Sequence, residues 1–380
     1  MCVLRSAVIS VLLLGVVVIP TSASTISVTN ISDSGPGSLR QALLSANDGD
    51  TIDATGVSGV IALTGGELLV QKSVTINGGG PDVLAVDGNA VSRVFHIGAG
   101  KTVTISGLTI TNGHDDTLGG GIENEQGATL TISNSILSSN VAGSVGNPAV
   151  QGGGIHSLGT LTIVNTTITA NSAGGISGVG GGIYNGGTVT ILNSTVSANT
   201  ASAGGGLNNG SAAGIAATIT NSTFSGNAAV AYGGACFNGG RLHLTNSTLS
   251  GNSANTGSGI LVFGPLQIGN TILDKGDTGA TIGSFGAVTV ISLGYNLSSD
   301  DGSGHLTGPG DQINTDPMLG PLQDNGGPTF THALLRRSPA INAGDPNFTP
   351  PPSNDQRGPG FRRVRNGRID IGSYEVQRQL

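Results

Sequence analysis

Short segments in which apolar and polar residues alternate recur along the middle of this chain. Five copies are clear and a sixth is weaker: LTISNSILSSN (130–140), LTIVNTTITAN (161–171), VTILNSTVSAN (189–199), ATITNSTFSGN (217–227), LHLTNSTLSGN (242–252) and LQIGNTILD (266–274). Alternation with a period of two is typical of β-strands, and no helical period runs through these copies. Successive copies are 31, 28, 28, 25 and 24 residues apart. This spacing indicates a stacked-repeat solenoid, because no single unit can bury its apolar face alone.

A second recurring phrase separates the copies: GGGIEN (119–124), GGGIHS (152–157), GGGIYN (180–185), GGGLNN (204–209) and GGACFN (233–238). Each step therefore holds about three short strands with Gly or Asn at the turns between them. The pattern predicts an all-β fold, a right-handed parallel β-helix of roughly eight to ten coils stacked about 4.8 Å apart. The predicted inward column is Ile132, Ile163, Ile191, Ile219, Leu244 and Ile268. Its predicted outward neighbours are Thr131, Thr162, Thr190, Thr218, His243 and Gln267.

Two columns of asparagine accompany the repeats. The first is Asn134, Asn165, Asn193, Asn221, Asn246 and Asn270. The second is Asn140, Asn171, Asn199, Asn227 and Asn252. Asn tolerates the left-handed backbone of a tight corner, and its amide can bond to the same amide in the coils above and below. We therefore interpret both columns as structural ladders and favour this interpretation over a ligand site.

The two ends of the chain differ from the repeats. Residues 1–23 combine Arg5, an apolar run and small residues, as a secretory signal peptide does. Residues 24–56 are predicted to form an N-terminal cap with one short helix, which begins at Ser38 or Gly37 and ends near Asn47, and which covers the first coil. The coils are placed at 57–298. Residues 299–380 are rich in Pro, Gly, Asp and Arg but keep apolar anchors, and they are predicted to form a loop-rich C-terminal cap.

Three segments resemble known families. GGACFN (233–238) and FSGN (224–227) are similar to the repeats of chlamydial polymorphic outer-membrane proteins. SDSGPGSLRQALLSAN (32–47) resembles the N-terminal segment of secreted bacterial right-handed β-helix proteins, whose fold is pectin lyase-like. Residues 316–375, from DPMLGPLQDNGGPTF to RIDIGSYE, resemble the choice-of-anchor Q domain. The resemblance implies this fold and export to the cell surface, but no particular chemistry. In that family a sorting tail usually follows the domain, whereas this sequence ends at Leu380.

Charge is scarce along the chain. Charged residues make up 10% of it, the net charge is −7, and this balance gives no reason to expect a nucleic-acid partner. Behind the signal peptide one cysteine remains, Cys236, which is expected to be a buried packing residue. No segment of the mature chain is predicted to span a membrane, and a monomer is expected.

Enzymes of this fold class that act on polysaccharides need positioned carboxylates and a proton-transfer group. From Gly127 to Leu273 the sequence contains no Asp, Glu or Lys and only one Arg, Arg241. His156 and His243 lie in this uncharged stretch, where no acidic partner is expected. The central coils therefore lack the side chains that a lyase or glycosidase requires, and the sequence favours a protein without catalysis.

The early coils do hold a group of charged residues: Arg93, His96, Lys101, His114, Asp115, Asp116, Glu123 and Glu125. Its catalytic candidates are His114, Asp115, Asp116, Glu123 and Glu125, and its candidates for a Ca²⁺ site are Asp115, Asp116 and Glu123. No other cofactor is implied. The competing interpretation is a solvated loop on an uncharged shaft, and we favour it.

Threonine pairs are expected to stack on one outward face: Thr109 and Thr111, Thr167 and Thr169, Thr195 and Ser197, Thr223 and Ser225, and Thr248 and Ser250. Such arrays occur on ice-binding surfaces, but they also suit any charge-poor outer strand. The sequence thus predicts a secreted or cell-surface shaft, adhesin-like, that binds extracellular polysaccharide or surface proteins. A polysaccharide-active enzyme, either pectate-lyase-like or a glycoside hydrolase, is the main alternative, and an ice-binding protein is a minor one.

Overall fold

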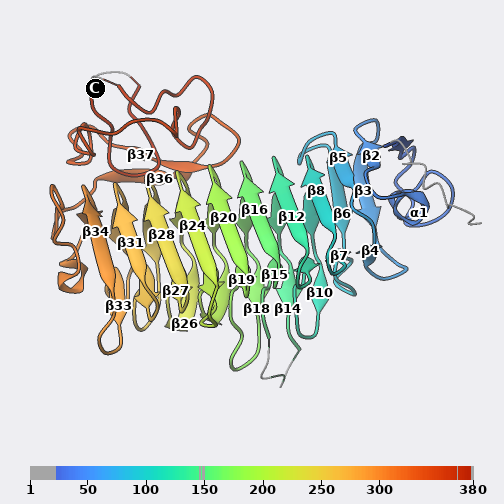
Figure 1. Ribbon diagram of the computed structural model, residues 1–380, viewed down its shortest axis with the longest axis horizontal. Coiled ribbons are helices and arrows are strands. Elements are labelled where there is room, and N and C mark those ends of the chain that lie inside the picture. The colour runs from blue at the N-terminus through green and yellow to red at the C-terminus, as the bar shows by residue number, and fades with distance from the viewer. Residues whose placement is uncertain (1–22, 145–146, 148–149, 366, 378–380) are drawn as a thin grey trace, which may run out of the picture.

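The computed structural model describes residues 23–144, 147, 150–365 and 367–377. The predicted signal peptide falls outside them except for Ala23. The chain winds into an elongated right-handed parallel β-helix, which confirms the predicted fold class (Figure 1). Four stacks of parallel strands run along its length, and we call them sheets A to D.

Sheet A has 11 strands: β1 (Thr25–Ser27), β2 (Thr51–Ala54), β5 (Thr75–Gly78), β8 (Thr102–Ser106), β12 (Thr129–Ser133), β16 (Thr160–Val164), β20 (Thr188–Leu192), β24 (Ala216–Thr220), β28 (Arg241–Thr245), β31 (Leu266–Gly269) and β34 (Val290–Gly294). Sheet B has 10: β3 (Gly59–Ala62), β6 (Leu84–Asp87), β9 (Thr109–Thr111), β13 (Ile136–Ser138), β17 (Thr167–Thr169), β21 (Thr195–Ser197), β25 (Thr223–Ser225), β29 (Thr248–Asn252), β32 (Ile272–Lys275) and β35 (Leu297–Ser298).

Sheet C has nine strands: β4 (Leu68–Val70), β7 (Phe95–Ile97), β11 (Ile122–Asn124), β15 (Ile155–Ser157), β19 (Ile183–Asn185), β23 (Leu207–Asn209), β27 (Cys236–Asn238), β30 (Ile260–Val262) and β33 (Ile282–Ser284). Sheet D has five: β10 (His114–Asp115), β14 (Val141–Ala142), β18 (Ser172–Ala173), β22 (Thr200–Ala203) and β26 (Ala228–Tyr232).

The core runs along the axis between these sheets. Ile132 of β12 lies opposite Ile163 of β16, which lies opposite Ile191 of β20, and all three are fully buried. Ile219, Leu244 and Ile268 continue this column, with at most 2% of each residue exposed. Because side chains alternate along each strand, the neighbouring Thr131, Thr162 and Thr190 face outward. Repetition of this register makes one continuous core from single short strands.

Helix α1 (Leu39–Ser45) covers the first coil. The hydroxyl of Ser38 accepts a hydrogen bond from the backbone N–H of Gln41 and so caps the helix N-terminus. Leu39, Ala42 and Leu43 are buried against the core. No helix within the described ranges is long and apolar enough to cross a membrane.

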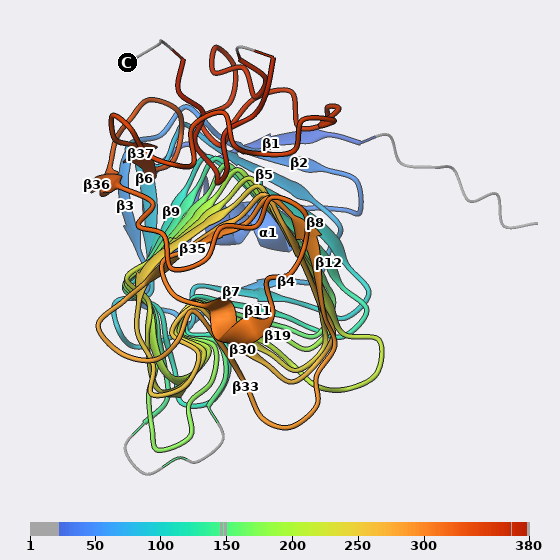
Figure 2. The ribbon, with the colours of Figure 1, turned by 90° about the vertical axis from the view of Figure 1, so that its left-hand side faces the viewer.

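The C-terminal region differs from the predicted cap. Its first part does lie over the last coil, where the 3₁₀ turn η1 (Gly302–Gly304) contacts β33 and Leu306 joins the core (Figure 2). The rest, with the antiparallel hairpin β36 (Leu319–Gln323) and β37 (Thr331–Leu334), turns back along the side of the solenoid (Figure 1). The chain beyond residue 316 therefore covers the outer face of sheet B rather than its end.

This packing changes the interpretation of the threonine pairs. Thr195 donates a hydrogen bond to the Phe330 carbonyl oxygen at 2.6 Å, Thr223 donates one to Gln356 at 2.6 Å, and the Ser373 backbone N–H donates one to Thr248 at 3.1 Å. Those three threonines are no more than 1% exposed. The prediction of an exposed threonine array is therefore wrong for the coils with Thr195, Thr223 and Thr248, where the hydroxyls hold the C-terminal region in place.

Candidate functional site

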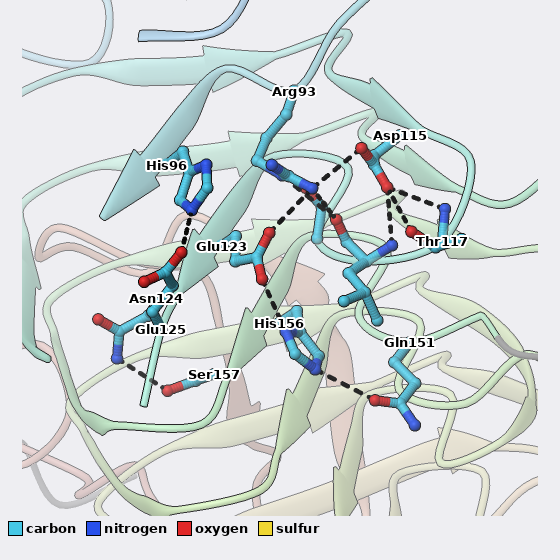
Figure 3. A network of polar contacts seen from close by, with 12 residues as sticks. Arg93, His96, Asp115, Thr117, Glu123, Asn124, Glu125, Gln151, His156 and Ser157 are labelled. Carbon is cyan, nitrogen blue, oxygen red and sulfur yellow. Dashed lines mark hydrogen bonds and ion pairs between the residues drawn. The ribbon is translucent and has the colours of Figure 1, made fainter. Parts of the chain in front are cut away.

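The predicted early-coil group comes together on the outer face of sheet C (Figure 3). Its central column runs from Leu69 through His96, Glu123 and His156 to Tyr184, with one residue from each of β4, β7, β11, β15 and β19 in register. The strand neighbours of these residues face inward; Phe95 and Ile97, for example, are fully buried. The strand alternation thus projects these five side chains outward in one row.

Arg93 is the centre of the charged group. It precedes β7 and is 7% exposed. One guanidinium nitrogen, Nη1, lies 2.6 Å from Glu67. The other, Nη2, lies 2.9 Å from Asp115 and 3.0 Å from Glu123, and it also donates to the Leu118 carbonyl oxygen at 2.8 Å. A single buried cation therefore holds together three carboxylates from three coils.

His96 links two further carboxylates across the coils. Its Nδ1 lies 2.8 Å from Glu67 and its Nε2 lies 2.7 Å from Glu125. The hydrogen bond to Glu67, together with that to Glu125, raises the pKa of His96 from 6.5 to about 9. In turn, the hydrogen bond from His96 to each glutamate lowers the pKa of Glu67 and of Glu125. His96 is therefore a cation at neutral pH, with one carboxylate on each side.

Glu123 and His156 form a second, less polar part of the group. Glu123 lies 3.9 Å from Nδ1 of His156, and burial raises the pKa of Glu123. His156 is 1% exposed and stacks on Tyr184 with ring centroids 5.2 Å apart. Burial lowers the pKa of His156 to about 4, so its ring is neutral at pH 7. The prediction that His156 has no acidic partner is therefore wrong, because the stacking of coils places Glu123 next to it.

The remaining candidates lie at the edge of the group. Asp115 accepts hydrogen bonds from the backbone N–H groups of Thr117 and Leu118, and although burial opposes its ionisation these bonds and Arg93 lower its pKa. His114 and Asp116 lie 3.6 Å apart, and 72% of the Asp116 side chain is exposed. These residues line an open hollow of about 220 Å³ beside Glu67 and Arg93. Lys101 is outside the group, at 3.9 Å from Asp48.

The three Ca²⁺ candidates do not converge on one point. Arg93 lies between Asp115 and Glu123, and the side chain of Asp116 is directed toward His114 instead. Among the residues described, no three or more His, Cys, Asp and Glu side chains are placed to hold a metal ion. A guanidinium occupies the place that a cation would need.

The second asparagine column is a buried ladder. Asn140, Asn171, Asn199, Asn227 and Asn252 are at most 1% exposed. Each of the first four donates from its side-chain amide to the Oδ1 of the next at 2.9 Å. Each also donates its backbone N–H to that same oxygen, at 2.9–3.1 Å. The amide of one coil is thus both donor and acceptor for its neighbours.

The first column occupies left-handed corners, with φ between 48° and 56° for Asn134, Asn165, Asn193, Asn221, Asn246 and Asn270. It is less regular: Asn165 donates to Asn134 at 3.3 Å and Asn221 donates to Asn193 at 2.7 Å. Its later members contact the C-terminal region, and the Asp345 backbone N–H donates to Asn270 at 2.8 Å. The outer corners are thus a docking edge for that region.

Sequence reasoning missed two features. One is Glu67, which binds both Arg93 and His96 although it lies 26 and 29 residues before them. The early coils lack the repeated phrase that would have aligned it. The other is a third ladder, in which Asn185 donates to Asn209 and Asn209 to Asn238, both at 2.8 Å. The signal for this ladder was present, since these residues end the glycine-rich phrases.

Comparison with known proteins supports the fold. The crystal structure of pectate lyase Pel9A superposes with a TM-score of 0.53 at 16% identity, covering 93% of this chain and 97% of that chain. At this identity the likeness shows a shared β-helix fold and nothing finer. No protein-family model and no curated protein matches the chain. The resemblance of residues 316–375 to the choice-of-anchor Q domain therefore stays a prediction.

Proposed function

We propose that this protein is a non-catalytic β-helix shaft that binds extracellular polysaccharide or surface proteins. The observation that carries the proposal is the position of Arg93 between Asp115 and Glu123. A glycosidase needs two carboxylates with the sugar between them, and a lyase needs a free base beside the uronate. Here a guanidinium takes the space between the carboxylates, and His96 neutralises Glu67 and Glu125. Glu67, Asp115, Glu123 and Glu125 thus each lie beside a cation of the group.

Location is part of the proposal. We infer that residues 1–23 direct export and that residues 316–375 are a choice-of-anchor Q module, so that the protein acts outside the cell or at its surface. The sequence resemblances at 32–47 and 316–375 support this inference, as does the low charge of the shaft. Fusion of residues 1–30 to a reporter that is active only after export tests it. Retention of that reporter in the cytoplasm would contradict the proposed location.

Two assays on the mature protein test the function. The first follows the absorbance of unsaturated uronates and the release of reducing ends from pectate, polygalacturonate, alginate and chondroitin, with and without Ca²⁺. We expect no turnover. The second is a glycan array, on which we expect binding. Turnover would reject the non-catalytic proposal, and a protein that binds no glycan and no surface protein would reject the binding proposal.

One observation favours a polysaccharide-active enzyme as the second candidate. Glu123, whose pKa is raised, lies 3.9 Å from a neutral His156 that is stacked on an aromatic ring. A carboxyl group whose ionisation is disfavoured by burial, beside an imidazole that is neutral at pH 7, can supply an acid and a base. If turnover is found, Glu123→Gln should abolish it while Glu125→Gln, two residues along the same coil and in contact with His96 instead of His156, should not. Equal activity in both variants would exclude this pair.

A further inference from the structure

The outward row of sheet C continues beyond the charged group and becomes aromatic. Tyr184 of β19 lies opposite Asn208 of β23, which lies opposite Phe237 of β27. Phe263 follows β30 and Phe285 follows β33, on the same side of the solenoid. We call these residues, with Tyr232, the sheet C strip.

Aromatic residues are rare in this protein, which makes their position informative. The chain has eight Phe, four Tyr and no Trp. Within the coils, Phe95 and Phe224 are buried in the core. Between residues 96 and 290, all the Phe and Tyr residues except Phe224 belong to the sheet C strip. The solenoid therefore places its outward aromatic rings on one face.

The rings of the strip touch one another and are open to solvent. Phe237 and Phe263 are stacked with centroids 5.9 Å apart, Phe263 and Phe285 are 6.0 Å apart, and Tyr232 meets Phe285 edge-on at 5.5 Å. Tyr232, Phe263 and Phe285 are 40%, 55% and 46% exposed. An exposed cluster of this kind is typical of a binding surface.

An amide without a protein partner lies inside the strip. Asn208 is 6% exposed, and within the described parts of the chain its side chain makes no hydrogen bond, so its amide is available to solvent or to a ligand. It stands between Tyr184 and Phe237 in the outward row. The neighbouring Nδ1 of His156 is also buried without a hydrogen-bond partner among the described residues. Polar groups that have no protein partner and lie beside aromatic rings fit a ligand that supplies the missing hydrogen bonds.

The surroundings of the strip are rich in glycine and carry little charge. Glycine triplets precede β15, β19 and β23, and a Cβ at Gly181 would lie 2.4 Å from the carbonyl oxygen of Thr200. Only glycine fits at that position. No acidic residue or lysine lies between 127 and 273, and Arg241 is the one arginine there. An anionic ligand would find one cation near the strip and carboxylates at its early end.

We infer that the sheet C strip binds a chain of uncharged pyranose sugars along the solenoid axis. Pyranose rings present apolar C–H faces to aromatic rings and hydroxyls to amide and imidazole groups, and both kinds of partner alternate along this row. Consecutive rows are about 4.8 Å apart, close to the length of one sugar unit in an extended chain. The carboxylates at the early end can accept hydrogen bonds from hydroxyls but repel uronates. This inference rests on the proposed glycan-binding function and names its surface and its ligand class.

Affinity electrophoresis of the mature protein in gels containing hydroxyethyl cellulose, glucomannan, galactomannan or polygalacturonate tests the inference. We expect retardation by at least one of the three uncharged polymers and none by polygalacturonate. Phe263→Ala and Asn208→Ala should each weaken the affinity by about tenfold, the loss expected for one ring contact or one buried hydrogen bond.

Two matched controls separate binding from folding. Phe330→Ala removes a ring that is 52% exposed but belongs to the C-terminal region, and should leave the affinity unchanged. Asn208→Ala should leave the melting temperature unchanged, since it breaks no protein hydrogen bond. Asn209→Ala, one residue along, breaks the third ladder and should lower the melting temperature while the folded protein still binds.

Three outcomes would overturn the inference. If an uncharged polymer binds but Phe263→Ala and Asn208→Ala retain full affinity, the shaft binds glycans elsewhere and only the strip is rejected. If binding is confined to polygalacturonate or to charged glycans on the array, the ligand class is wrong while the proposed function stands. If sedimentation shows a dimer that Phe263→Ala dissociates, the strip is a surface between two copies of this chain.

Discussion

The early and central coils share one backbone geometry but satisfy their polar groups in opposite ways. In the early coils opposite charges face one another, so that His96 of β7 lies between Glu67, which precedes β4, and Glu125, which follows β11. In the central coils the interior ladder repeats one residue, as in Asn171, Asn199 and Asn227. In the charged group, neighbouring positions on successive coils hold different residues, whose side chains form ion pairs. In the interior ladder, equivalent positions hold the same residue, asparagine, and its amides bond to one another.

The difference follows from the stacking distance. Equivalent side chains of a parallel β-helix lie about 4.8 Å apart, so that identical charges would repel strongly at every step. An amide is both donor and acceptor, and identical amides therefore attract. A charged group is stable in this frame only if its sign alternates from coil to coil. Five predictions, from the largest expected effect to the smallest, test this contrast.

Replacement of Arg93 should have the largest effect. Arg93→Met leaves Glu67, Asp115 and Glu123 close together without their shared cation, and should lower the free energy of unfolding by about 3–4 kcal/mol. Urea denaturation measures it. The double variant Arg93→Met with Glu123→Gln should recover part of the loss. If the double variant is no more stable than the single one, the carboxylates do not repel and the early-coil interpretation is wrong.

Replacement of an asparagine in the buried ladder of the central coils should have the second-largest effect on stability. Asn199→Ala leaves the backbone N–H and side-chain amide of Asn171 without their acceptor in a dry core, and removes one of the two donors to the side-chain oxygen of Asn227. We expect a loss of about 3 kcal/mol in urea denaturation. Asn199→Asp, of the same size but unable to donate, should be at least as damaging. A loss below that of Asn193→Ala would show that the inner ladder is not the stronger one.

Replacement of an asparagine at an outer corner should lower the free energy of unfolding by less than replacement of an inner-ladder asparagine. Asn193 is half-buried and has a φ of 49°, and its side chain accepts one hydrogen bond from Asn221. Asn193→Ala should cost about 1.5 kcal/mol, mainly because alanine disfavours the left-handed backbone. Asn193→Gly relieves that strain and should cost less. Equal losses for the two variants would assign the effect to the amide contact instead.

A smaller, pH-dependent effect should come from His96. Its pKa is raised in the folded protein to about 9, so its stabilising charge is fully present below pH 6.5 and is lost as the pH rises through 9. The difference in stability between the parent and His96→Leu should therefore shrink between pH 6.5 and 9. Solvent screening at this half-buried site keeps the effect to about 1 kcal/mol. Burial also raises the pKa of Glu375 to about 8, but that group titrates in both proteins and cancels in the difference.

The repeat phrases predicted most of the fold, since each position of the predicted inward column is an apolar residue that directly follows an outward polar one. Ile132, Ile163 and Ile191 could be assigned for that reason. The docking of the C-terminal region could not. It depends on contacts such as that between Thr195 and the Phe330 carbonyl group, 135 residues apart, from a segment without periodicity.

The charged group could be predicted only in part. Asp115, Glu123 and Glu125 are near neighbours in sequence, and the repeat placed them in one region. Their partners are set by coil length, which varies most where the phrases are weakest, and so Glu67 was missed. The contact between Glu123 and His156 was also missed, although the two residues hold the same place in the successive phrases GGGIEN and GGGIHS and their strands are adjacent.

Added Ca²⁺ should have the smallest effect. Arg93 donates to Asp115 and Glu123 from between them, and the backbone N–H groups of Thr117 and Leu118 already bind the other Asp115 oxygen. A Ca²⁺ ion would have to displace the guanidinium and desolvate, and no exposed set of oxygens compensates for that loss. Millimolar CaCl₂ against EDTA should therefore shift the melting temperature by less than about 1 °C, within the range of screening by salt. The control variant Arg93→Met removes the internal cation and should gain thermal stability from Ca²⁺, since Asp115 and Glu123 then lack their cationic partner. A large shift in the parent protein, abolished by Asp116→Asn, would instead show that these side chains rearrange to bind the metal.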